Sequence, residues 1–177
     1  MSQPPEREPI RDLISGRMLP DREDEPVRQA AEARLLALGY APDQVAVEFW
    51  REVQTSEGPL SVRADLLVSL AGEPALLIRC ARGSLVSRER EAVAAARLIR
   101  RPWVPLCAVY NGEDGELIAT ADGKVLSAGP EALPGPAELA DLAARHPARA
   151  ATERELTQAA RIYRAYGFIS CPGQCTV

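Results

Sequence analysis

The sequence predicts an α/β fold in which helices flank a mixed β-sheet and a helical extension follows the sheet. Apolar residues alternate over several short segments, as in strands, and recur at helical spacing in others. A predicted helix lies between the apolar segments 75–81 and 103–110. A helical crossover is typical of a parallel strand pair, whereas short turns, as elsewhere in this chain, join antiparallel strands. The sheet is therefore expected to be mixed.

The elements are expected in the order helix, three strands, helix, three strands and two further helices. Asp24 can cap the first helix, and Gly39 ends it. In segment 61–70 the alternate apolar residues from Val62 to Leu70 are expected to share one face. The helices are expected at 24–38, 88–100, 137–145 and 152–166, and the strands at 44–55, 61–70, 75–81, 103–110, 116–121 and 124–129.

The chain is expected to divide into three parts. Residues 1–22 are polar, with one apolar patch, and form an arm or short helix that packs on the core. Residues 23–130 form the α/β domain, and residues 131–177 form the helical extension and a tail that contains Cys171 and Cys175. These two cysteines supply half of the four ligands of a usual zinc site, so the tail is expected to carry free thiols.

The composition is that of a globular protein. It is 46% hydrophobic and 26% charged, and no segment approaches the run of ~18 apolar residues that a membrane span needs. The first residues carry acids and prolines and lack the apolar region of a secretory signal, so a cytoplasmic location is expected. The single histidine, His146, excludes any mechanism or metal site that needs two.

The charged residues are unevenly distributed. Of the 21 basic residues only Lys124 is a lysine, and the net charge is −4, whereas a DNA-binding domain is usually basic. Arginines nevertheless concentrate in 79–101. They can form a phosphate-binding stripe, or a solvated helix face that Glu89 and Glu91 balance. The candidate nucleic-acid contacts are Arg79, Arg82, Arg88 and Arg90.

Five segments together resemble the N-terminal domain of the type I restriction enzyme R subunit, which has the PD-(D/E)XK, or restriction-endonuclease-like, nuclease fold. The resemblance extends over residues 20–128 and rests on the order and spacing of the segments. They are EPVRQ (25–29), LGYAPDQVAVE (38–48), RADLLV (63–68), PALLIRCARG (74–83) and YNGED (110–114).

The resemblance implies metal-assisted phosphodiester hydrolysis. In that family the catalytic centre contains an Asp together with the Glu and the Lys of an E-x-K motif, which lies on the next strand. It often also contains a Glu of the first helix. Clustered carboxylates hold Mg²⁺, which lowers the pKa of a bound water. The Asp falls on Asp65, the helix Glu on Glu25 with Glu32 as a substitute, and the E-x-K on Arg79-Cys80-Ala81.

The sequence therefore predicts a nuclease fold whose centre is vestigial. The acidic ligand and the lysine of E-x-K are both replaced, and Arg82 nearby stays protonated and is a poor proton acceptor. The vestigial catalytic candidates are Asp65, Glu25 and Arg82. Because a cation relieves repulsion between carboxylates, we expect Asp65 and Arg79 to pair across their strands. A purely structural ion pair is the simpler interpretation of Asp65. No cofactor is expected, unless the centre survives and Asp65 binds Mg²⁺.

The resemblance implies a stand-alone, catalytically degenerate relative of the R-subunit domain, whose partners are DNA or proteins of a restriction or defence system. One alternative is an active Mg²⁺-dependent endonuclease with a migrated centre that uses Asp65, Glu25 or Glu48, and Arg82. Another is a protein–protein scaffold that reuses the fold and binds no nucleic acid. No membrane partner is expected.

Overall fold

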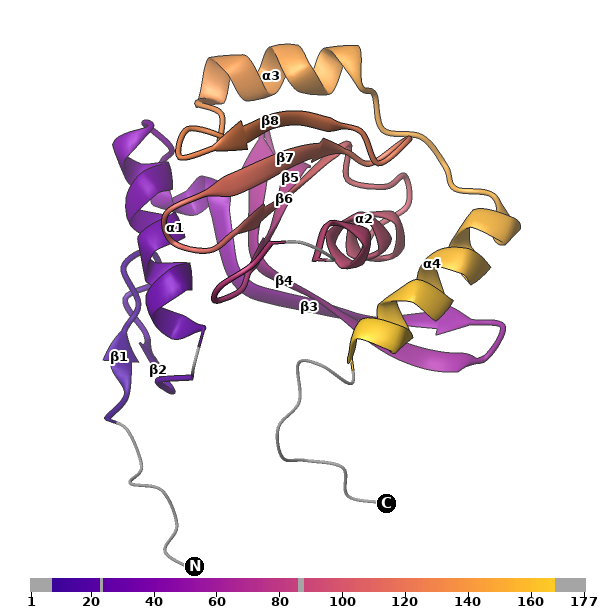
Figure 1. Cartoon of the computed structure of the whole chain (residues 1–177), viewed down its shortest axis with the longest axis horizontal. Coiled ribbons are helices and arrows are strands. Elements are labelled where there is room, and N and C mark those ends of the chain that lie inside the picture. The colour runs from indigo at the N-terminus through magenta and orange to yellow at the C-terminus, as the bar shows by residue number, and fades with distance from the viewer. Residues whose placement is uncertain (1–7, 23, 86–87, 168–177) are drawn as a thin grey trace, which may run out of the picture.

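The computed structural model describes residues 8–22, 24–85 and 88–167. At its centre is a six-stranded mixed sheet (Figure 1). The strands stand side by side in their sequence order, and every neighbouring pair is antiparallel except β5 and β6. The parallel pair predicted from the intervening helix is therefore confirmed. The strands are β3 (Val45–Thr55), β4 (Gly58–Leu70), β5 (Glu73–Cys80), β6 (Leu106–Tyr110), β7 (Gly115–Ala119) and β8 (Val125–Gly129).

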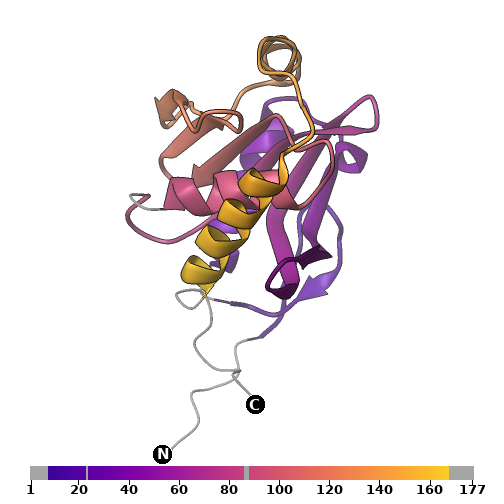
Figure 2. The ribbon, with the colours of Figure 1, turned by 90° about the vertical axis from the view of Figure 1, so that its right-hand side faces the viewer.

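Four α-helices cover the two faces of this sheet (Figures 1 and 2). Helices α2 and α4 share a hydrophobic cluster on one face, and α1 and α3 share another on the opposite face. The predicted α/β fold, with a mixed sheet, flanking helices and a C-terminal helical extension, is thus confirmed. No helix in the described ranges is long and apolar enough to cross a membrane. The helices are α1 (Glu25–Ala37), α2 (Arg88–Leu98), α3 (Pro136–Arg145) and α4 (Glu153–Gly167), and a 3₁₀ turn, η1, covers Pro42–Gln44.

The segment before α1 is a small hairpin. Strand β1 (Ile10–Arg11) pairs with β2 (Met18–Leu19). Of the two forms predicted for residues 1–22, an arm or a short helix, the helix is therefore wrong for the described part. The Asp12 side chain accepts a 2.6 Å hydrogen bond from the backbone N–H of Ser15. An aspartate that bonds its own chain in this way favours a turn over a helix.

Strands β3 and β4 share an irregularity that positions the candidate site. Val47 pairs with Leu66 and Phe49 with Ala64, so Glu48 and Asp65 lie opposite one another. Val47 and Leu66 pack on the α1–α3 side, whereas Phe49 and Ala64 pack on the α2–α4 side. The expectation that the alternate residues from Val62 to Leu70 share one face is therefore wrong, because both strands change face at this point.

Candidate functional site

Asp65 and Arg79 form the predicted ion pair. Nη1 of Arg79, on β5, lies 3.5 Å from the Asp65 carboxylate on β4. The backbone N–H of Cys80 donates a 2.7 Å hydrogen bond to the same carboxylate. The side chains of Asp65 and Arg79 are 21% and 13% exposed. The pair therefore ties the irregular part of β4 to the end of β5.

A second carboxylate, that of Glu91, completes this site, although one of the two interpretations of segment 79–101 placed Glu91 on a solvated helix face. Oε1 of Glu91 accepts a 3.0 Å bond from Nη2 of Arg79, and Oε2 lies 3.1 Å from Nη1 of Arg88. The Glu91 side chain is only 3% exposed. Its position four residues before Ala95 and seven before Leu98, both buried, was the sequence signal for this burial. The Arg79 guanidinium thus lies between Asp65 and Glu91.

Helix α4 lies on the same face of the sheet as α2 and also contacts this site. The backbone N–H of Arg63 donates a 3.0 Å hydrogen bond to the hydroxyl of Tyr163, and the carbonyl of Arg63 accepts a 3.3 Å bond from Arg79. Tyr163 itself is buried. The C-terminal extension therefore contacts the same short stretch of β4 as Arg79.

The charge states within the site follow from burial and from these neighbours. Burial lowers the pKa of Arg79, but the charges of Asp65 and Glu91 outweigh it and raise that pKa above its ordinary value. Burial, with the added charge of Asp65, raises the pKa of the Cys80 thiol well above its usual range. The guanidinium therefore stays charged, and Cys80 is not a thiolate nucleophile.

The residues present do not fit Mg²⁺. Asp65 and Glu91 both pair with the Arg79 guanidinium, and its positive charge would repel a second cation. Within residues 8–22, 24–85 and 88–167, no three His, Cys, Asp or Glu side chains gather where they could hold a metal ion.

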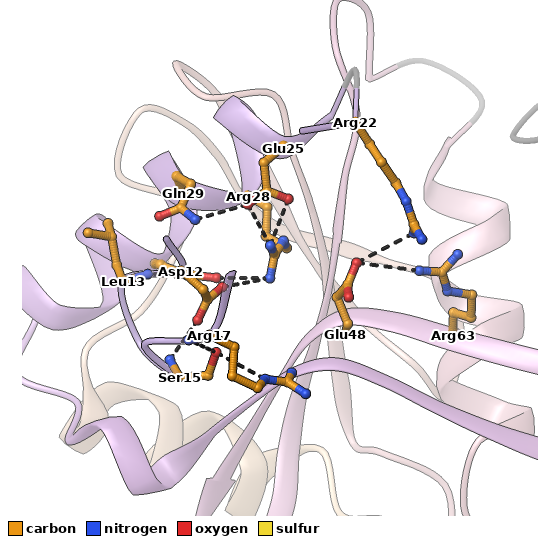
Figure 3. Close-up of polar contacts among 11 residues, drawn as sticks. Asp12, Leu13, Ser15, Arg17, Arg22, Glu25, Arg28, Gln29, Glu48 and Arg63 are labelled. Carbon is orange, nitrogen blue, oxygen red and sulfur yellow. Dashed lines mark hydrogen bonds and ion pairs between the residues drawn. The ribbon is translucent and has the colours of Figure 1, made fainter. Parts of the chain in front are cut away.

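Glu25 belongs to a separate buried network around Arg28 (Figure 3). Glu32 contacts Arg28 in the same network. Nη2 of Arg28 lies 2.6 and 2.7 Å from the two Glu25 oxygens, and Nη1 lies 2.9 Å from Asp12 and 3.2 Å from Glu32. Glu25 and Glu32, on which the helix Glu of the resembled motif falls, are therefore buried in a network apart from Asp65. Arg28 supplies the charge that allows both to be buried, and Glu25, its oxygens committed to Arg28, is not poised as a metal ligand.

Crowding of carboxylates in this network separates their pKa values. Burial and the neighbouring Asp12 raise the pKa of Glu32 to about 8. For Asp12, burial acts in the same direction, but hydrogen bonds from Ser15 and the other contacts outweigh it and lower the pKa. Glu32 also accepts a 3.2 Å hydrogen bond from the backbone N–H of Leu13. The network therefore joins the β1–β2 hairpin to α1.

Glu48 belongs to a third group of charged side chains, in which it lies between Arg22 and Arg63 (Figure 3). Its Oε1 is 3.5 Å from Nη1 of Arg22 and 3.7 Å from Nη2 of Arg63. Its backbone has φ of 50°, in the left-handed region. A residue other than glycine in that region costs roughly 1–3 kcal/mol. The face change shared by β3 and β4 thus places a strained glutamate between two arginines.

The four candidate nucleic-acid contacts separate into two kinds. Arg79 and Arg88 are held by Glu91, whereas Arg82 and Arg90 are exposed. The backbone N–H of Arg82 donates a 3.3 Å hydrogen bond to Asp24 Oδ1. That carboxylate makes no capping bond to α1, so the predicted cap is wrong. Ala81 is buried directly after β5. Cys171 and Cys175 lie outside the described residues.

A comparison with known protein families shows to which family this chain is related. The family model described as type I restriction enzyme R protein N terminus matches residues 23–133, well over half of the chain. The chain belongs to this family. No curated protein and no solved structure matches it.

The family match contains some parts of the site and leaves others outside. It runs from α1 to β8 and includes Asp65, Arg79 and Glu91. The β1–β2 hairpin lies before the match, and α3 and α4 lie after it. Asp12, which pairs with Arg28, and Tyr163, which bonds Arg63, therefore lie outside the matched residues.

Proposed function

We propose that this member of the type I restriction enzyme R protein N-terminus family binds DNA without cleaving it, in a restriction or defence system. The observation that carries the proposal is the Arg79 guanidinium between Asp65 and Glu91, 3.5 and 3.0 Å from their oxygens. It supplies, from the protein, the positive charge that a metal ion brings to clustered carboxylates.

The same arrangement argues against hydrolysis. Metal-assisted cleavage needs carboxylates free to hold Mg²⁺, which activates a water and stabilises charge on the phosphate. An arginine cannot activate water in this way, because it stays protonated and accepts no proton. The lysine position of the resembled motif is Ala81, a buried apolar residue. Family membership and the exposed Arg82 and Arg90 support the DNA-binding part of the proposal.

The direct test incubates the wild type and Asp65→Ala with labelled DNA and Mg²⁺ or Mn²⁺. We expect no cleavage by either protein, while a commercial nuclease confirms that the substrate can be cut. Cleavage by the wild type alone would support the active endonuclease with a migrated centre at Asp65, Glu25 or Glu48, and Arg82. A protein that neither cuts DNA nor binds it at low salt would support the scaffold, since DNA binding through phosphates depends steeply on salt.

Replacing Arg79 by alanine tests whether its charge stands in for a metal. Arg79→Ala leaves Asp65 and Glu91 without the shared cation, and we expect it to lower the free energy of unfolding by about 2 kcal/mol in EDTA. Added Mg²⁺ should recover part of that loss, because a divalent cation can enter between the freed carboxylates. Urea unfolding with and without Mg²⁺ measures both effects.

Arg90→Ala is the matched control, because Arg90 is exposed near the start of α2. Its stability should equal that of the wild type, and neither protein should respond to Mg²⁺. A wild type that Mg²⁺ stabilises as much as it stabilises Arg79→Ala would contradict the proposed role of Arg79.

A further inference from the structure

Arg22 and Arg63 approach one oxygen of Glu48 from different segments of the chain. Arg22 comes from the stretch before α1 and Arg63 from β4, and Figure 3 shows both guanidinium groups directed at the Glu48 carboxylate. The contacts of 3.5 and 3.7 Å are long. Charged hydrogen bonds of this kind are normally about 2.7–2.9 Å. Glu48 is therefore a loose partner for both arginines.

The two guanidinium groups are open to solvent and keep most of their donors. The side chains of Arg22 and Arg63 are 57% and 45% exposed, whereas that of Glu48 is 24% exposed. In the part of the chain that the structure describes, Glu48 is the one side chain that pairs with either group. Each guanidinium has five N–H donors in a planar fork that matches the oxygens of a phosphate. Arg28, by contrast, is closely surrounded by three acidic side chains and is only 4% exposed.

The backbone, more than close ion pairing, accounts for the position of Glu48. Its φ of 50° places it at the shared irregularity of β3 and β4, directly opposite Asp65. Strained residues of this kind cluster at ligand sites, where the surrounding structure holds them. A carboxylate held in this way fills the space between two cations without saturating either one.

We propose that Arg22 and Arg63 bind a backbone phosphate of DNA, and that Glu48 is the internal anion that occupies their site when DNA is absent. The proposal rests on the DNA-binding function proposed above and names its contact residues. An incoming phosphate brings the same charge sign as Glu48 and more acceptor oxygens, so it can engage both forks where the carboxylate engages each weakly.

The surroundings of this phosphate site agree with a longer DNA contact. Asp24, two residues after Arg22, accepts a hydrogen bond from the backbone of Arg82. The exposed Arg82 is therefore near the same end of α1, and a strand that contacts Arg22 can continue towards it. Asp24 is the exposed acid between them, and its carboxylate is partly occupied by this bond.

The test measures binding of a fluorescein-labelled DNA duplex by anisotropy, in EDTA and over a series of salt concentrations. Arg22→Ala/Arg63→Ala should weaken binding about tenfold or more and reduce the slope of log K against log salt by about one, since the two arginines together neutralise one phosphate. Glu48→Gln, which keeps the shape and removes the negative charge, should tighten binding severalfold. Arg145→Ala is the control, an exposed arginine at the end of α3, and should bind as the wild type does.

The outcomes separate this inference from the function on which it rests. If the wild type binds DNA and the double variant, shown to be folded by circular dichroism, binds with equal affinity and slope, the phosphate site is wrong and DNA binding stands. If the wild type binds no DNA at low salt, the proposed function fails as well. Tighter binding of a single-stranded RNA of the same sequence would also overturn the assignment to DNA. Tightening by Glu48→Gln together with the smaller slope of the double variant supports it, because a merely structural role predicts neither.

Discussion

Arg28→Ala is expected to lower the free energy of unfolding by about 3–5 kcal/mol, the usual effect of removing one partner from a buried ion pair. Arg28 holds Asp12, Glu25 and Glu32, and all four side chains are at most 4% exposed. Without the guanidinium, three acidic side chains would be buried with no cation among them. Burial of an unpaired charge is one of the most destabilising changes that a single substitution can make.

Urea unfolding followed by circular dichroism measures this effect. Arg34→Ala provides the matched control on the same helix, because Arg34 forms only a 3.9 Å pair with the exposed Glu131, and such surface pairs contribute about 0–1 kcal/mol. A second variant, Arg28→Met, keeps most of the side-chain volume and should be destabilised by a similar amount. Equal stability of Arg28→Met and the wild type would show that charge in this network does not matter.

The fold could be predicted because its signals are local. Alternating apolar residues mark the strands, and the helix between β5 and β6 requires a parallel connection. The pairing of Asp65 with Arg79 was predicted from the family resemblance, which places Arg79 where the motif has an acid, on the strand next to Asp65. The predictions of the strands and of their parallel pair need only spacing, residue type and the rules of sheet topology.

The surroundings of Glu25 and Glu32 could not be predicted in the same way. Their burial depends on Arg28 and on Asp12, which lies 16 residues from Arg28 in the sequence. A partial signal was present, since Arg28 and Glu32 lie beside Ala31 and Leu35 on the buried side of α1. Charges on an apolar stripe indicate either exposure or a buried pair, and the sequence does not name the partner.

The irregularity at Glu48 and Asp65 was also invisible in the sequence. Apolar alternation continues from Val62 to Val68 without interruption, so a regular strand was expected. The change of face coincides with the left-handed backbone of Glu48, directly opposite Asp65 on the neighbouring strand. The pairing register of the two strands is the same on both sides of this point, so the spacing of the apolar residues carries no sign of it.

Stability is expected to fall as pH rises from about 5 to about 8, because Glu32 keeps its proton in the folded protein. Its pKa is raised from 4.5 to about 8 by burial and by Asp12. Between these values the folded state binds more protons than the unfolded state, so the free energy of unfolding decreases with pH. The contribution of Glu32 is complete below its unfolded pKa and is lost as pH reaches its folded pKa. The expected loss is on the order of 3 kcal/mol.

Other acidic side chains change the stability at lower pH or change it in the same direction as Glu32. The lowered pKa of Asp12, which its hydrogen bonds to Ser15 produce against the effect of burial, stabilises the fold above its ordinary value of 3.8 and is lost only at lower pH. Burial and the neighbouring Glu89 raise the pKa of Glu116, so Glu116 acts in the same direction as Glu32. The decisive quantity is therefore the difference in slope between the wild type and a variant that cannot titrate at position 32.

Glu32→Gln is that variant, and its urea midpoint should change much less than that of the wild type between about pH 5 and pH 8. Glutamine keeps the shape of the protonated acid and can accept from the backbone N–H of Leu13 as Glu32 does. Glu131→Gln, at an exposed position, should retain the wild-type slope. Equal slopes for the wild type and Glu32→Gln across this range would show that Glu32 is ionised in the fold. Arg28 would then face three carboxylates at neutral pH, and the loss from Arg28→Ala should be larger at pH 8 than at pH 5.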